Sequence, residues 1–297
     1  MKQAELLCYN LVVIIDFHTH IFPPWLKNNL GQYLEADPLF AAMYSSPKAR
    51  LATADELITS MDNHGIDISV VQNIAWSNSR ICVETNNYIL ESVNRYPRRL
   101  VGFCSVPNGS PEEALGELER CACQGIRGVG EMRPETPWLT AENSGIIKPI
   151  IETIIKHNLV LLTHTSESVG HRYPGKGSLT PEVLYPLITS YPDLKLVCAH
   201  WGGGLPFYAL MPEVKRAMTN VFFDTAASPF LYNHQVYRQV VQLVGDDKVL
   251  FGSDYPLLSP GRLLREIESL ELPEETKHLI LSGNARRLLG IKIASGS

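Results

Sequence analysis

Eight short apolar segments alternate with helical patterns along most of this chain. These segments are rich in β-branched residues, which is typical of strands buried on both faces in a parallel sheet. The predicted strands cover residues 11–16, 68–73, 100–106, 126–131, 159–164, 195–200, 221–224 and 248–253. Strands that alternate with helices form parallel βα units. Eight such units in 297 residues predict a closed (β/α)8 barrel, the TIM-barrel fold of class α/β.

The connections agree with this architecture. Helical patterns cover about residues 79–96, 144–157, 205–218, 233–244 and 274–289, and Pro111, Pro181 and Pro260 each follow a hydroxyl residue at a predicted helix start. Thr53 and Glu56 form a capping-box pattern at the start of one predicted helix, and Gly65 follows its last periodic residue. Residues 20–52 are rich in proline, asparagine and aromatic residues, so we expect an irregular loop that elaborates the first βα connection. An open doubly wound sheet is the alternative fold, but the glycine-rich phosphate turn that it favours after the first strand is not found there. We therefore expect one domain over residues 11–297, preceded by an N-terminal extension at residues 1–10.

Composition excludes several classes of protein. The chain is 45% hydrophobic, which is too apolar for an intrinsically disordered protein, and its net charge of −5 argues against a dedicated nucleic-acid binder. The apolar run at residues 11–15 is too short to span a membrane, and no signal peptide is recognisable. The six cysteines form no C-x-x-C pair, so reduced thiols are expected. These features predict a cytoplasmic protein with neither nucleic-acid nor membrane partners.

Side chains that bind metals fall at the carboxyl ends of the predicted strands, where a barrel places its active site. They are His18, His20, Glu131, His164, His200 and Asp254. Any one of them alone has an ordinary explanation: a short His-x-His sequence occurs by chance, and Glu131 has Arg127 and Arg133 nearby for an ion pair. Together they predict a divalent metal centre. Zn²⁺ is the first expectation, with Mn²⁺ or Fe²⁺ as alternatives.

A loop after the fifth predicted strand suggests the substrate. Arg172 and Lys176 lie on this glycine- and proline-rich segment and could bind an anionic small molecule, although a solvated basic loop would have the same composition. Trp76 and Trp201 could stack on a planar substrate, and Trp201 could equally pack against the barrel wall.

An ordered set of motifs resembles the amidohydrolase superfamily, and more narrowly its amidohydrolase-related branch, which contains aminocarboxymuconate-semialdehyde decarboxylase. The motifs are D-F-H-T-H at residues 16–20, T-H at 163–164, C-A-H-W-G-G-G at 198–204, F-G-S-D-Y-P at 251–256 and S-G-N-A-R-R-L-L-G at 282–290. The resemblance implies that His18, His20, His164 and Asp254 bind one metal ion. It implies that His200 faces the substrate as an acid, base or electrophile, or binds a second ion. Glu131 departs from the branch and is similar to the bridging glutamate of binuclear relatives, so one or two ions remain open.

The resemblance leaves the reaction undecided. Our first expectation is a hydrolase in which Asp254 takes a proton from a metal-activated water and His200 stabilises the oxyanion formed on an amide, lactone or ester. The alternative is a nonoxidative decarboxylase of an aromatic or muconate-type acid. A TatD-like nuclease and a barrel without catalysis are less favoured. Many members of the branch form dimers, so a homodimer is an open alternative to a monomer.

Overall fold

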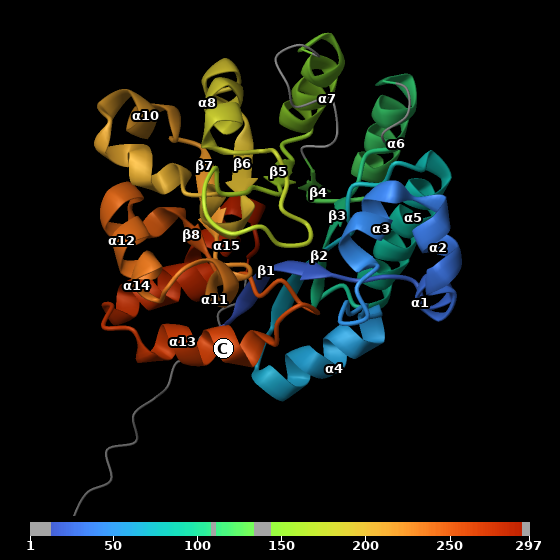
Figure 1. Cartoon of the computed structure of the whole chain (residues 1–297), viewed down its shortest axis with the longest axis horizontal. Coiled ribbons are helices and arrows are strands. Elements are labelled where there is room, and N and C mark those ends of the chain that lie inside the picture. Colours follow the sequence, from blue (N-terminus) through green and yellow to red (C-terminus); the bar gives the residue numbers. More distant parts are fainter. Residues whose placement is uncertain (1–12, 108–110, 134–143, 293–297) are drawn as a thin grey trace, which may run out of the picture.

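The predicted strands form one parallel sheet in which each strand pairs with the next one along the chain (Figure 1). The computed structural model describes residues 13–107, 111–133 and 144–292. Within these residues the strands are β1 (Ile15–His20), β2 (Ile68–Gln72), β3 (Leu100–Cys104), β4 (Gly128–Met132), β5 (Val160–Thr163), β6 (Lys195–Cys198), β7 (Val221–Asp224) and β8 (Val249–Leu250). Backbone hydrogen bonds join β1 to the segment that follows β8, from Phe17 N to Phe251 O at 2.7 Å and from Asp254 N to His18 O at 2.9 Å. The predicted (β/α)8 barrel is thereby confirmed.

Helices surround the sheet, and most begin where the sequence predicts them. The longer ones are α4 (Ala54–His64), α5 (Ser79–Arg95), α6 (Pro111–Cys123), α7 (Ser144–Lys156), α8 (Pro181–Ser190), α12 (Gln235–Val244) and α13 (Pro260–Ser269). The capping box at Thr53 is confirmed, because Thr53 Oγ1 accepts from Glu56 N and the Glu56 carboxylate accepts from Thr53 N. Gly65 ends α4 with φ at +69°, a conformation that glycine adopts without a steric cost.

Two helical predictions need correction. The stretch over residues 20–52 is not simply irregular, because it contains α1 (Pro24–Asn28), α2 (Leu30–Ala36) and α3 (Pro38–Tyr44). A buried Asp37 side chain caps α3 by accepting from Phe40 N at 2.9 Å. The helix expected over residues 205–218 is divided into η3 (Leu205–Leu210) and α10 (Pro212–Ala217), because Met211 is extended and Pro212 cannot donate a helical hydrogen bond.

Shorter helical segments complete the second half of the chain. They are α9 (Ala199–Gly202), α11 (Ser228–Leu231), η4 (Asp246–Lys248), α14 (Glu274–His278), η5 (Leu279–Gly283) and α15 (Asn284–Leu289). The last three form the run that the sequence predicts over residues 274–289, which is interrupted by one π-helical turn at η5.

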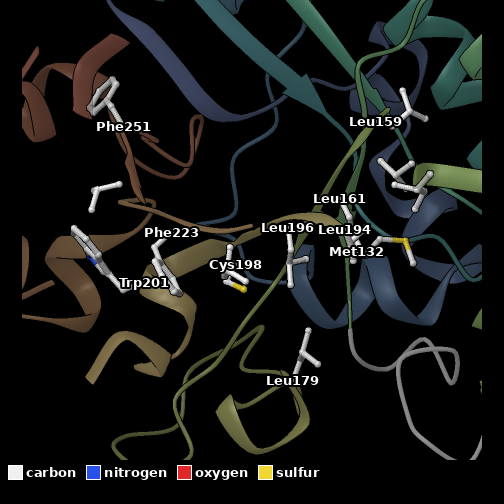
Figure 2. Close-up of a cluster of buried hydrophobic side chains, with 14 of the residues drawn as sticks. Met132, Leu159, Leu161, Leu179, Leu194, Leu196, Cys198, Trp201, Phe223 and Phe251 are labelled. Carbon is white, nitrogen blue, oxygen red and sulfur yellow. The ribbon is translucent and has the colours of Figure 1, made fainter. Parts of the chain in front are cut away.

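The alternation of side chains along each strand builds two apolar layers. Val197 of β6 points into the barrel, where it packs with residues such as Phe17 and Phe103. Its neighbours Leu196 and Cys198 belong to the layer between strands and helices that Figure 2 shows. The interior layer also contains Leu288 of α15, and it includes Ile15 near the amino end of β1. Apolar packing therefore fills the amino end of the barrel, which leaves the carboxyl end for polar side chains.

The structure does not test the expected N-terminal extension, domain limits, cellular location or oligomeric state. The proposed extension at residues 1–10 and Cys8 fall outside the described residues. The other five cysteines are free thiols. In the described part of the chain, no helix combines the length and the apolar character needed to cross a bilayer. The domain limits, the cytoplasmic location and the homodimer stay predictions.

Candidate metal centre and substrate cavity

The six predicted metal-binding side chains meet at the carboxyl end of the barrel. The Nε2 atoms of His18 and His20 lie 3.1 Å apart, and Asp254 Oδ1 lies 3.4 Å from His20 Nε2. On the other side of His18, Glu131 Oε1 lies 2.9 Å from His164 Nδ1 and 3.3 Å from His200 Nε2. The structure therefore brings together residues that are up to 236 positions apart in the sequence.

Each side chain enters the centre from the end of a strand. His18 and His20 occupy alternate positions of β1, so both project to the same side of the sheet. Glu131 lies in β4, while His164 directly follows β5. His200 lies in α9 with φ at +57°, and Asp254 has φ at +64° in the segment after β8. A positive φ is unfavourable for residues other than glycine. The backbone is therefore locally strained at the two positions whose side chains point into the cluster.

Two overlapping groups of donor atoms suit a metal ion. One contains His18, His20 and Asp254, and the other contains His18, Glu131 and His200. Within each group all the donor atoms lie within 4.8 Å of one another, and the residues are almost completely buried. Imidazole nitrogen and carboxylate oxygen are ligands that Zn²⁺, Mn²⁺ and Fe²⁺ accept. The donor set therefore fits a divalent ion, and Glu131 faces the histidines.

Asp224, an acidic residue that the sequence analysis did not single out, contacts His18 on the ring nitrogen that faces away from the cluster. Asp224, the last residue of β7, is completely buried. Its Oδ2 lies 2.8 Å from His18 Nδ1, and its Oδ1 accepts hydrogen bonds from the backbone N–H groups of His200 and Ala226. The sequence contained a signal for it, because Asp224 ends the seventh predicted strand just as the predicted metal-binding residues lie at the ends of theirs.

Nearby carboxylates favour the charged forms of His18 and His200 in the metal-free protein. Burial lowers the pKa of His18, but Asp224, Glu131 and Asp254 outweigh this effect and raise the pKa to about 10. Burial likewise opposes the charged form of His200, while Glu131 and Asp254 raise its pKa to about 9. Burial would raise the pKa of Asp254, yet its hydrogen bond with His20 and the nearby imidazoles lower it to about 2.

The pKa of Glu131 is lowered by nearby histidines, as is that of Asp254. Burial acts to raise the pKa of its carboxyl group, but His164, His200 and His18 hold the pKa well below its usual range. Glu131 is therefore an ionised carboxylate at neutral pH, which is the form that binds metals.

A cavity of about 450 Å³ opens above the centre. His20, Glu131, His164, His200 and Asp254 contribute to its lining. Apolar groups on its walls include Ile74, Phe230 and Leu257, which come from three different βα connections. A volume of this size lies at the lower end of the range for small-molecule sites.

Three cationic side chains also line this cavity. Lys48 and Arg50 are exposed residues between α3 and α4, whereas Arg133 is only 4% exposed and directly follows β4. Sequence reasoning treated Arg133 only as an ion-pair partner for Glu131. Its position two residues after Glu131 was a signal that it lies near the centre.

The four residues expected to bind substrate occupy other places. Arg172 is exposed, and Lys176 donates to the backbone oxygens of Val169 and His171 in its own loop. Trp76 is completely buried against Phe40 and donates to Asn73. Trp201 is also completely buried and donates to Ser228 Oγ at 2.5 Å.

None of these four appears among the described residues that line the cavity. In this structure Trp76 and Trp201 pack in the core, Lys176 turns back onto its own loop and Arg172 faces solvent, so a role of these residues in substrate binding stays a prediction.

The chain is similar to known proteins over almost its whole length. The model of a family described as amidohydrolase matches residues 15–291. The chain is 24% identical to 2-amino-3-carboxymuconate-6-semialdehyde decarboxylase of Dictyostelium discoideum, over 93% of this chain and 91% of the relative. It is 26% identical to 6-methylsalicylic acid decarboxylase of Penicillium expansum, over 92% of this chain and 95% of the relative.

A solved structure gives the same fold. It is 5-carboxyvanillate decarboxylase of Novosphingobium aromaticivorans, solved with manganese and 4-hydroxy-3-methoxy-5-nitrobenzoic acid. Its TM-score is 0.78 at 17% identity, covering 94% of this chain and 96% of the other. The expectation of a hydrolase is wrong, because the two relatives that match over more than nine-tenths of the chain are named decarboxylases, which supports the alternative stated above.

Proposed function

This chain belongs to the amidohydrolase family, and from that premise we propose that it catalyses the metal-dependent, nonoxidative decarboxylation of a small aromatic or muconate-type acid. The observation that carries the proposal is a cavity in which the buried His, Glu and Asp cluster lies beside cationic side chains. Such a cavity suits an organic anion whose reacting end reaches the cluster. The reaction class is supported by the two relatives that match over more than nine-tenths of the chain and are named decarboxylases.

A divalent ion is part of this proposal. His18, His20, Glu131, His164 and Asp254 would hold it, and His200 would join them if a second ion binds. When bound, the ion would polarise the oxygen atoms of the substrate and stabilise the negative charge that develops on them. Its identity is open: the ligand types favour zinc, and the similar structure contains manganese.

The balance of the reaction defines what the protein residues must do. The bond between the carboxylate carbon and the ring or alkene carbon breaks, and carbon dioxide leaves. The electron pair stays on the ring or alkene carbon, which must then take up a proton. The protein must therefore supply one proton beside the cluster and exclude other reactions there.

His200 is the residue that we propose as the proton donor. It lines the cavity, and its Nδ1 lies 3.2 Å from the backbone oxygen of Ala226, so the ring is held with Nε2 toward the cluster. In the metal-free protein Glu131 and Asp254 favour the charged form of His200, the form that carries the proton that the carbon needs. Asp254 stays ionised beside His20 and balances the charge of the imidazoles.

The outer cations would direct the anionic substrate into the site. Lys48 and Arg50 are exposed at the cavity lining, where their positive charge attracts a carboxylate from solution. The apolar walls then favour the hydrocarbon part of the acid.

The experiment is an assay of carbon dioxide release by protein reconstituted with Zn²⁺ or with Mn²⁺. The panel contains hydroxybenzoic acids with one or two carboxylates, together with esters and lactones of similar size. In D₂O, the expected product carries deuterium on the carbon that lost the carboxylate. His200→Gln should retain bound metal and lose most of this activity. Hydrolysis of an ester or lactone without release of carbon dioxide from any acid would overturn the proposal.

A further inference from the structure

One phenol hydroxyl in the cavity has no hydrogen-bond partner among the residues that the structure describes. It belongs to Tyr44, the last residue of α3, which is partly buried and lines the cavity. Burial raises the pKa of Tyr44, and the ionised Asp254 and Glu131 lie close enough to raise this pKa further. The hydroxyl therefore lies near the cluster and keeps its proton at neutral pH.

Two aromatic neighbours hold the ring of Tyr44 in place. Its centroid lies 4.8 Å from that of Phe40, with 23° between the ring planes, and 5.3 Å from that of Phe22, which it meets edge-on. Phe22 and Phe40 are completely buried, and Phe40 packs in turn against Trp76 at 5.0 Å. Because a packed cluster presents the hydroxyl, a ligand that binds there costs little further loss of side-chain freedom.

The other phenol among the described lining residues already has a partner. Tyr173, in the loop after β5, donates from its hydroxyl to Glu167 Oε2 at 3.1 Å. This acceptor belongs to the same loop, whereas Tyr44 can donate to a molecule in the cavity. The cavity thus contains two tyrosines of which only Tyr44 has a hydroxyl free to bind a ligand.

An uncharged oxygen atom is the partner that suits Tyr44. A phenol hydroxyl donates one hydrogen bond, which a hydroxyl or keto oxygen of a ligand can accept. A second carboxylate is less suitable, because one hydrogen bond from an uncharged donor does not offset the loss of its hydration. An apolar substituent is also less suitable, because it would separate the hydroxyl from water without replacing the hydrogen bond.

We propose that Tyr44 is a specificity-determining residue, which donates a hydrogen bond to a hydroxyl or keto oxygen of the substrate that lies away from the leaving carboxylate. This inference rests on the proposed decarboxylation, because the leaving carboxylate at the cluster directs the rest of the acid into the cavity. Tyr44 binds and orients the acid, while His200 delivers the proton. A tyrosine with a raised pKa is too weak an acid to replace His200 in that step.

Equilibrium binding tests this role without turnover. The probes are 3- and 4-hydroxybenzoate and 3- and 4-methylbenzoate, because a methyl group resembles a hydroxyl in size but cannot accept a hydrogen bond. Calorimetry with the zinc-reconstituted protein should show that at least one hydroxy acid binds about fivefold more tightly than its methyl counterpart. Tyr44→Phe should remove most of this preference, while its affinity for the methyl acids should change less than about twofold.

Tyr173→Phe is the matched control. It removes a hydroxyl from the same cavity, but one that is bound to Glu167, so the preference for the hydroxy acid should remain. Both variants should keep the metal content of the wild type. The melting temperature of Tyr44→Phe should also be unchanged, because its hydroxyl bonds to no described residue. Where turnover is found, Tyr44→Phe should raise KM for the hydroxy acid about fivefold and change kcat less.

Three results would overturn the inference. The first is a wild-type protein that binds none of the four acids, or binds each hydroxy acid only as tightly as its methyl counterpart. The second is an equal loss of affinity for hydroxy and methyl acids in Tyr44→Phe, which would mean that Tyr44 only shapes the cavity. The third is a preference that survives in Tyr44→Phe, whether or not Tyr173→Phe removes it.

The proposed reaction can fail separately from this inference. If the protein releases no carbon dioxide from any acid, decarboxylation is refuted, whereas the preference between the hydroxy and methyl acids in binding still reports on Tyr44.

Discussion

Oδ2 of Asp224 lies 2.8 Å from Nδ1 of His18, and this contact joins the ends of β7 and β1 beneath the cluster. It fixes the ring so that Nε2 of His18 faces His20, Glu131 and Asp254. Histidines that bind metals usually need such a partner on their second nitrogen, because it sets the tautomer and the orientation of the ring. Asp224 therefore orients His18, and we expect it to act as a positioning residue for the proposed metal centre.

Replacing Asp224 with asparagine should weaken metal binding by about 10–100-fold. The amide keeps the shape of the side chain but loses the negative charge. That charge favours the tautomer of His18 that has its proton on Nδ1 and leaves Nε2 free to bind a metal. Competition with a chelator measures the affinity, and Asp193→Asn, a change at an exposed position, is the control. An affinity equal to that of the wild type would mean that Asp224 serves only the backbone of the turn at His200.

Glu131 should prove to be a metal ligand. Its carboxylate lies between His164, His200 and His20, so Glu131→Gln should lower either the number of ions per chain or their affinity by at least about tenfold. Elemental analysis of protein purified without chelator gives the ion count, and two ions in the wild type would show that both donor groups are filled. Unchanged metal content and affinity in the variant would assign Glu131 a structural role.

Metal affinity should increase as the pH rises from 6 to 8. In the metal-free protein the carboxylates raise the pKa of His18 to about 10, so its ring is positively charged in this range. An imidazole must lose that proton to bind a metal, and the affinity should rise about tenfold per pH unit for each proton released.

The carboxylate of Asp254 adds no pH dependence here, since its pKa of about 2 keeps it ionised throughout. Calorimetry in buffers with different ionisation enthalpies counts the protons. Metal binding with no proton release at pH 7 would contradict the prediction.

Gly203 should tolerate no side chain. Its φ is +58°, and a Cβ atom at this position would meet the backbone carbonyl of Ser166 in the loop after β5. Gly203→Ala should lower the free energy of unfolding by about 1–3 kcal/mol, measured by chemical denaturation. Gly116→Ala is the matched control, because Gly116 is exposed within α6 and nothing lies within 4 Å of an added Cβ. That variant should gain about 0.4–1 kcal/mol, and equal effects of the two changes would refute the steric argument.

Local patterns in the sequence were sufficient to predict the barrel and the convergence of the six predicted metal-binding side chains. Runs of β-branched residues specify buried strands wherever they occur, and Thr53 with Glu56 specifies a helix start without help from distant residues. Parallel strands of one barrel all end on the same side, so the positions of His18, His20 and Asp254 at strand ends suffice to predict that they converge.

The substrate site depended on contacts that no local pattern contains. Arg172 and Arg133 are the same residue type near the ends of predicted strands, yet Arg133 is held in the cavity by Met43 and Gly175 while Arg172 faces solvent. Trp201 directly follows His200, the proposed proton donor, but its ring packs edge-on against Tyr237, thirty-six positions later in the sequence. The sequence by itself determined the fold and the end of the barrel at which the predicted metal-binding residues meet, because both follow from the positions of the strands. Only the tertiary structure decided which cations line the cavity, because the direction of a loop side chain is set by packing against distant segments.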